Sequence, residues 1–246
     1  MSQADLVRTS RDGDQFHYLR AARLCLELLQ LGTSLVAVTI EGTSPDEEIT
    51  EGLNVIDLAL YHGSSDPDSA SQIAYRQFKH STLHAAEEWT DSGLTKTLEG
   101  FAARYQKFIK CYGSDDVSKR FRFEFETNRP ISAKVFEALS DLAQGQESKR
   151  SAYFRGKLPL TGSALRSFAK LVHLIPNVPD YLTQRSLLEQ GLGAYLPDSD
   201  KDAPLQLKDL VTRKATTEFE RNPQIRRQDV LDAIGAREHS LFPVPS

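Results

Sequence analysis

Apolar and polar residues alternate in three segments of the first third of the chain, a pattern that is typical of β-strands. The segments cover residues 35–41, 54–61 and 73–81, and loops rich in Gly, Ser, Pro and Asp separate them. A fourth alternating segment covers residues 121–126. Because a helical pattern lies between the third and fourth segments, we expect a meander of three strands and a fourth strand added through a helical crossover.

Apolar residues recur at helical spacing around and after these strands. The pattern predicts helices over residues 14–30, 94–112, 132–144, 163–174, 179–189, 205–219 and 226–234. The chain is therefore expected to be an α/β protein with a mixed sheet flanked by helices, followed by a helical subdomain. The expected boundaries are a core over residues 10–157, a helical subdomain over 158–236 and a linker or tail over 237–246.

Composition narrows the class of protein. The 246 residues carry a formal charge of −4, which argues against a protein that simply coats nucleic acid. No apolar run approaches the length of a membrane span and the N-terminal residues lack the apolar stretch of a signal peptide, so we expect a cytoplasmic protein. Cys25 and Cys111 lie in helical patterns and are expected to be reduced core residues.

Basic residues gather in one stretch despite the acidic total. Lys149, Arg150, Arg155 and Lys157 lie around two aromatic residues. Such a segment is typical of a loop that contacts the phosphates of DNA. A solvated loop with a small aromatic anchor explains the same residues.

The second and third strands carry the main candidate chemistry. Alternation places Gln77 and Lys79 on one face of the third strand and leaves Asp57 on the side opposite its apolar neighbours. If the strands pair, the carboxylate and the amide oxygen can hold Mg²⁺ or Mn²⁺, and the Lys79 ammonium can act on a metal-bound water or a phosphate. The same residues also fit an ordinary strand-end acid and a solvated lysine, since short patterns of this kind occur by chance.

Two further residues are candidates at this site. Glu41 ends the first strand and is either an added metal carboxylate or a solvent-facing acid. At the polar start of the first helix, Asp12 or Asp14 caps the helix, or Gln15 reaches the edge of the site. The histidines are scattered, and neither a zinc-binding grouping nor a glycine-rich nucleotide motif is present.

With these residues in place, the chain resembles the restriction-endonuclease-like superfamily with the PD-(D/E)xK signature, in its Gln-x-Lys variant. Asp57 matches the strand-borne acid, and Gln77-Phe78-Lys79 matches the second half of the signature. Together with residues 11–18 and 125–130, they resemble the double-stranded DNA endonuclease domains of bacterial anti-phage defence. Such domains occur as CD-NTase-associated effectors and at the N-terminus of antiviral STAND ATPases.

The resemblance implies a restriction-endonuclease-like core, cleavage of double-stranded DNA with Mg²⁺ or Mn²⁺, and activity as an antiviral effector in an oligomer. Carried over by position, Asp57 and Gln77 bind metal with Glu41 as an added ligand, and Lys79 is the catalytic lysine. One departure is the neutral amide of Gln77, which is a weaker ligand than a carboxylate. The resemblance also implies a fused or associated sensor or ATPase module, so we expect the N-terminal part of a longer protein. The competing hypothesis is a non-catalytic DNA-binding or assembly domain that keeps the fold.

Overall fold

A mixed sheet of six strands forms the centre of the computed structural model, which describes residues 3–195, 201–216, 218 and 222–235. The strand order is β5-β4-β3-β2-β1-β6. β1, β2 and β3 form an antiparallel meander, and β4 is parallel to β3, so the predicted arrangement is confirmed. The strands are β1 (Leu35–Ile40), β2 (Leu58–His62), β3 (Gln72–Lys79), β4 (Phe121–Thr127), β5 (Val172–Ile175) and β6 (Gln224–Ile225).

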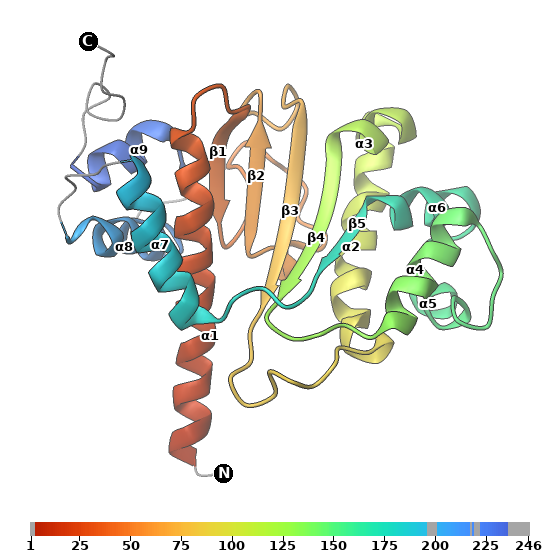
Figure 1. The fold of residues 1–246 in the computed structure, drawn as a ribbon. Coiled ribbons are helices and arrows are strands. Elements are labelled where there is room, and N and C mark those ends of the chain that lie inside the picture. The colour runs from red at the N-terminus through yellow and green to blue at the C-terminus, as the bar shows by residue number, and fades with distance from the viewer. Residues whose placement is uncertain (1–2, 196–200, 217, 219–221, 236–246) are drawn as a thin grey trace.

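Helices cover both faces of the sheet (Figure 1). One face packs against α1 (Gln3–Cys25), α7 (Tyr181–Tyr195), α8 (Ala203–Lys214) and α9 (Arg227–Ala233). The other face packs against α2 (Asp91–Tyr112), α4 (Ala133–Gln144), α5 (Ala152–Lys157) and α6 (Gly162–Leu171), while α3 (Ser114–Arg120) leads into β4. The α/β class and the flanking helices therefore agree with the sequence prediction.

Each face of the sheet has its own hydrophobic core. Along β3, Ile73 and Tyr75 belong to the core under α2, whereas Ala74 and Phe78 belong to the core under α1. This division follows from the strand period of two, which sends successive side chains to opposite faces. Because both faces are buried, polar residues within the central strands are costly unless they are paired or functional.

Several predicted elements differ from the structure. The second strand begins at Leu58 because a 3₁₀ turn, η2 (Leu53–Val55), precedes it, and the first helix extends from Gln3 to Cys25 before another such turn, η1 (Leu26–Leu29). The helix expected over residues 163–174 ends at Leu171, where β5 begins. Its apolar residues continue directly into the strand, so periodicity did not separate the two elements.

The segment expected to be a helical subdomain also supplies strands. Neither β5 nor β6 was predicted, and both pair within the sheet. The stretch 149–157 forms the short helix α5 at its end, and α3 was missed as well. The boundary at residue 157 stays a prediction, and the tail over 237–246 lies outside the described residues.

Two other expectations concern the surroundings of the chain. Cys25 is buried as predicted, whereas Cys111 is exposed, so the prediction that both are core residues is wrong for the second. Among the described residues, every helix is too short or too polar to cross a membrane.

Candidate functional site

Four predicted residues lie close together at one end of the central strands, where β1 and β3 end and β2 begins. The Glu41 N–H donates to the Asp57 carbonyl at 2.8 Å, and the Asp57 N–H donates to the Arg76 carbonyl at 2.9 Å. The first bond extends the β1–β2 ladder by one residue, and the second extends the β2–β3 ladder and places Asp57 opposite Gln77. Lys79 is the last residue of β3. We call Glu41, Asp57, Gln77 and Lys79 the edge cluster.

Asp57 is the most perturbed acid of the edge cluster. Its Oδ2 accepts a hydrogen bond from the Phe78 N–H at 2.7 Å. Burial and, to a smaller extent, the neighbouring Glu41 raise the pKa of the Asp57 carboxyl, while His17, the Phe78 hydrogen bond and the Lys79 ammonium act in the opposite direction. The net direction is upward, so the neighbouring groups do not fully compensate the buried negative charge. A bound cation would supply that compensation.

Gln77 and Lys79 differ in their surroundings although they share a face of β3. The Gln77 side chain is only 4% exposed, and its Oε1 accepts a hydrogen bond from the hydroxyl of Thr97 on α2. Lys79 lies next to the open edge and is half-buried. Its positive charge acts to lower the pKa of Asp57, although the larger effect of burial leaves that pKa raised. The strand register thus places Gln77 and Lys79 beside Asp57, and their roles at a site stay a prediction.

Glu41 follows β1 in an unusual backbone conformation. Its φ is 51°, in the left-handed region that non-glycine residues rarely adopt. Residues held in this region store strain, and such positions cluster at functional sites. The strained turn keeps Glu41 hydrogen-bonded to Asp57 through its backbone, so two acidic residues stand side by side.

His17 reaches the edge cluster from α1 and was not selected from the sequence. Its Nδ1 lies 3.9 Å from a carboxylate oxygen of Glu41, and its ring packs edge-on against Phe78 with 5.7 Å between centroids. The helical periodicity could have indicated this position, because Phe16 lies on the buried face of α1 and His17 lies at the border of that face. Treating the histidines as scattered missed it.

The other predicted contact residues lie elsewhere. The Lys208 ammonium of α8 donates to the Gln15 amide oxygen, so Gln15 faces α8. Arg150 is paired with Glu137 at 2.8 Å, and an Arg155 guanidinium nitrogen donates to the Ser148 carbonyl at 3.2 Å.

The basic stretch does not stand free as a phosphate-binding loop. Lys149 and Arg150 line a cavity of about 490 Å³ between α2, α4 and α5 that also contains two acids, Glu88 and Asp91. Lys157 is exposed at the end of α5. A role for these residues in binding DNA has no support in this geometry.

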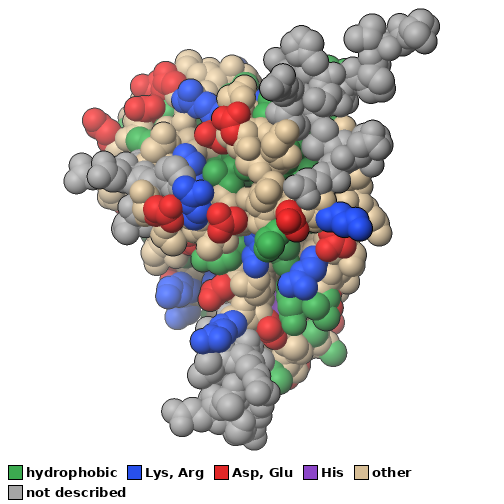
Figure 2. Space-filling view, turned by 90° about the vertical axis from the view of Figure 1, so that its left-hand side faces the viewer, with side chains coloured by type: hydrophobic (Ala, Val, Ile, Leu, Met, Phe, Trp, Pro, Cys, Tyr) green, Lys and Arg blue, Asp and Glu red, His purple; other side chains and the backbone are tan. Residues whose placement is uncertain are grey.

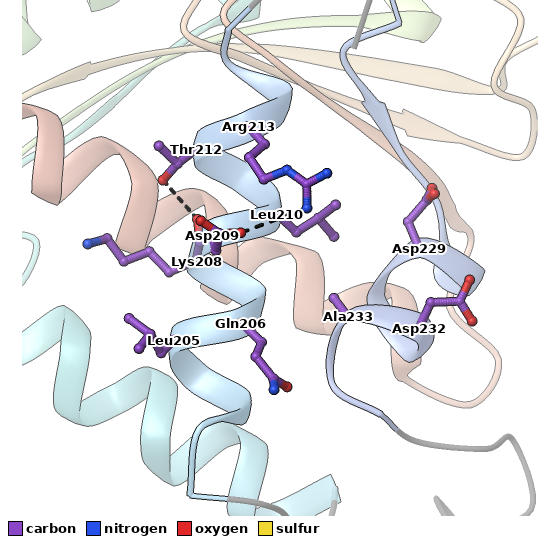
Figure 3. Close-up of a pocket in the computed structure, with 10 residues that line it drawn as sticks. All are labelled: Leu205, Gln206, Lys208, Asp209, Leu210, Thr212, Arg213, Asp229, Asp232 and Ala233. Carbon is purple, nitrogen blue, oxygen red and sulfur yellow. Dashed lines mark hydrogen bonds and ion pairs between the residues drawn. The ribbon is translucent and has the colours of Figure 1, made fainter. Parts of the chain in front are cut away.

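A larger cavity of about 860 Å³ lies between α8 and α9 (Figure 3). Its charges are mixed, since Lys208 and Arg213 share it with Asp209, Asp229 and Asp232. Basic and acidic side chains are also interspersed over the described part of the face that Figure 2 shows. This face therefore has no strong preference for ligands of one charge.

The edge cluster is compatible with a hard divalent cation. Among the described residues, no group of three or more His, Cys, Asp or Glu side chains is placed to hold a metal ion. A cation at this edge would have Asp57 and Glu41 as its protein carboxylates. That number fits Mg²⁺, which keeps several waters and is usually bound through one or two carboxylates together with substrate phosphates.

Comparison with known proteins returns solved structures alone. No family model matches the chain, and no curated protein matches it. Two structures of the Acinetobacter baumannii Cap4 SAVED/CARF-domain containing receptor, with the cyclic trinucleotides 2'3'3'-cAAA and 3'3'3'-cAAA, match with 14% identity and a TM-score of 0.49, covering 90% of this chain and 44% of theirs. The corresponding receptor from Moraxella osloensis matches with 14% identity and a TM-score of 0.47, covering 90% of this chain and 46% of its own. The chain thus spans less than half the length of these receptors.

These structures overturn the family assignment drawn from the motifs. They are described as SAVED/CARF-domain receptors and not as PD-(D/E)xK nucleases, and two of them are described with cyclic trinucleotides and not with double-stranded DNA. The prediction of a double-stranded DNA endonuclease, and of double-stranded DNA as the partner, is corrected accordingly. The alternative of a DNA-binding or assembly domain is no better supported, and no finding supports the fused module or the active oligomer. At this level of similarity the receptors carry no argument about what the present chain binds.

Proposed function

We propose that the edge cluster binds a divalent cation, Mg²⁺ or Mn²⁺, together with a phosphate group, and that the chain hydrolyses a phosphodiester bond there. The observation that carries this proposal is the placement of the Asp57 carboxylate, which lies opposite Gln77 at the strand ends and, among the described residues, accepts one hydrogen bond, from the Phe78 N–H. Glu41 adds a second carboxylate from the adjacent strand end. The two carboxylates outnumber the one ammonium group, so the local net charge is negative and favours the binding of a divalent cation.

Each residue has a distinct part in this chemistry. Asp57 and Glu41 hold the cation from neighbouring strand ends that are joined by a backbone hydrogen bond. Lys79 stabilises negative charge that develops on the phosphate oxygens, because its half-buried ammonium is less screened by water than a fully exposed one. The cation, when bound, polarises the phosphate and lowers the pKa of a coordinated water.

The test combines cation binding with turnover of a generic substrate. Wild type, Asp57→Asn and Lys79→Ala are titrated with Mn²⁺ by calorimetry and assayed with bis(p-nitrophenyl) phosphate, which requires no DNA. Asp57→Asn keeps the acceptor for the Phe78 N–H but removes the charge, so Mn²⁺ affinity is expected to fall by about tenfold or more and hydrolysis to disappear. Lys79→Ala is expected to bind Mn²⁺ normally and to lose about 10²-fold in kcat.

Glu137→Gln serves as the matched control, because it also removes one carboxylate but from an exposed ion pair on α4. It should match wild type in both assays. If Asp57→Asn binds Mn²⁺ as tightly as wild type, or if hydrolysis persists in EDTA, the proposal is wrong.

A further inference from the structure

The orientation of the Gln77 amide distinguishes two roles for this residue. Gln77 is 4% exposed and Thr97 is 5% exposed, so their hydrogen bond is buried beneath α2. The Thr97 hydroxyl donates, and the Gln77 Oε1 accepts. A side-chain amide carries one oxygen acceptor and one NH₂ donor on opposite branches of a plane. With the oxygen directed at α2, the NH₂ group is the branch that remains.

The NH₂ group is available to a ligand. Within the part of the chain that the structure describes, the Gln77 Nε2 makes no hydrogen bond. This nitrogen keeps some contact with solvent. Asp57 lies directly across the ladder, and Lys79 lies two residues further along the same face. The free donor therefore belongs to the same edge at which the charges of the cluster meet.

The same contact argues against Gln77 as a metal ligand. To be a metal ligand, Gln77 would have to offer its amide oxygen, and in the observed orientation that oxygen is directed at Thr97 of α2. Turning the amide would direct its NH₂ group at Thr97 and its oxygen at the site, so the observed orientation is the one that presents a donor to a ligand. A donor at this position instead complements the negative oxygens of a phosphate.

We infer that Gln77 donates a hydrogen bond to the oxyanion bound at the edge cluster, and that Thr97 is the positioning residue that fixes the amide for this purpose. The inference rests on the proposed function and assigns Gln77 to the phosphate side of the site. It also accounts for a neutral residue beside Asp57, since a third carboxylate here would repel the phosphate.

The experiment separates cation binding from anion binding. Gln77→Met keeps the length of the side chain and removes both polar groups. Mn²⁺ alone is titrated first, and inorganic phosphate is then titrated in the presence of Mn²⁺. Gln77→Met should keep its Mn²⁺ affinity within about twofold, while phosphate affinity falls by about tenfold, as expected for one hydrogen bond to a charged group. A tenfold loss of Mn²⁺ affinity in Gln77→Met would overturn the inference.

Thr97 is tested with a matched pair of variants. Thr97→Val has the same shape without the hydroxyl, and Thr97→Ser retains the hydroxyl. Phosphate affinity should fall several-fold in the valine variant and stay near wild type in the serine variant, with Mn²⁺ affinity unchanged in both. Equal phosphate affinities in the two variants would contradict a positioning role. If Thr97→Val does not fold, as judged by circular dichroism, Gln77→Met still decides the role of the amide.

The outcomes distinguish this inference from the proposed function. If Asp57→Asn leaves Mn²⁺ binding intact, the proposed cation site fails. If Asp57→Asn abolishes Mn²⁺ binding while Gln77→Met and Thr97→Val bind phosphate like wild type, the inference about Gln77 fails alone.

Discussion

The carboxylates of the core and the carboxylate of Asp57 in the edge cluster are compensated differently. Glu126, which is fully buried on β4, accepts hydrogen bonds at 2.7 Å from Arg20 of α1 and from Arg76 of β3. Glu47 forms a buried ion pair with Arg104 of α2. In both places the fold itself supplies the opposite charge.

Asp57 at the edge has no such partner. In the part of the chain that the structure describes, its carboxylate accepts one backbone hydrogen bond and no cation lies within ion-pair distance. A buried charge without a partner costs free energy of folding, so proteins retain it where it has a function. The core charges therefore have partners within the fold, whereas under the proposed function the charge at Asp57 is kept for a ligand.

Removing the charge of Glu126 should have the largest effect on stability. Glu126→Gln leaves Arg20 with a neutral partner beneath α1, while Arg76 keeps Glu124 at 2.5 Å, and breaking a buried ion network of this kind costs about 3 kcal/mol. The side chains of Arg20 and Arg76 are 18% and 14% exposed, so water relieves part of the penalty. Urea unfolding measures the loss. A decrease below about 1 kcal/mol would show that the core network is not a main support of the fold.

The sequence predicted the edge cluster better than the core network, for a physical reason. Asp57, Gln77 and Lys79 lie on neighbouring strands of a meander, and strand alternation alone decides which side chains share a face. Arg20 and Glu126 are separated by 106 positions, and their contact depends on how α1 crosses the sheet. No local sequence pattern predicts the angle at which α1 crosses the sheet.

The missed elements follow the same rule. β6 has two residues, too few for any periodicity, and it exists because β1 offers a free edge. His17 was missed because its role depends on the docking of α1 beside β3. The Thr97 contact that turns the Gln77 amide toward α2 depends in the same way on the packing of α2.

Neutralising Asp57 should increase the stability of the metal-free chain, whereas neutralising Glu126 should decrease it. Burial raises the pKa of Asp57 in the folded state above its ordinary value of 3.8, so folding favours the protonated form and the ionised form opposes folding. Asp57→Asn is therefore expected to stabilise the metal-free chain at pH 7, by less than Glu126→Gln destabilises it.

The pH dependence provides the check on this expectation. The advantage of Asp57→Asn should be fully present above the folded pKa, shrink as the pH falls through it and vanish below 3.8, where wild-type Asp57 is protonated in both states. Urea unfolding in EDTA at several pH values measures the difference. If the variant is less stable than wild type at pH 7, then Asp57 is a structural acid like Glu126, and the comparison collapses.

The smallest effect is expected at the exposed pair of Arg150 and Glu137. Its atoms are 2.8 Å apart, similar to the core pairs, but the two side chains are 52% and 50% exposed. Water and salt screen such a pair, and Arg150 keeps a second acid, Asp141, at 3.3 Å. Glu137→Gln should therefore leave the urea midpoint unchanged at both low and high salt. The distance in this pair is close to that in the core pairs, and the main difference is burial. A loss of stability as large as that of Glu126→Gln would therefore mean that burial does not determine the strength of these ion pairs. The missing partner of Asp57 could then not be interpreted as a sign of function.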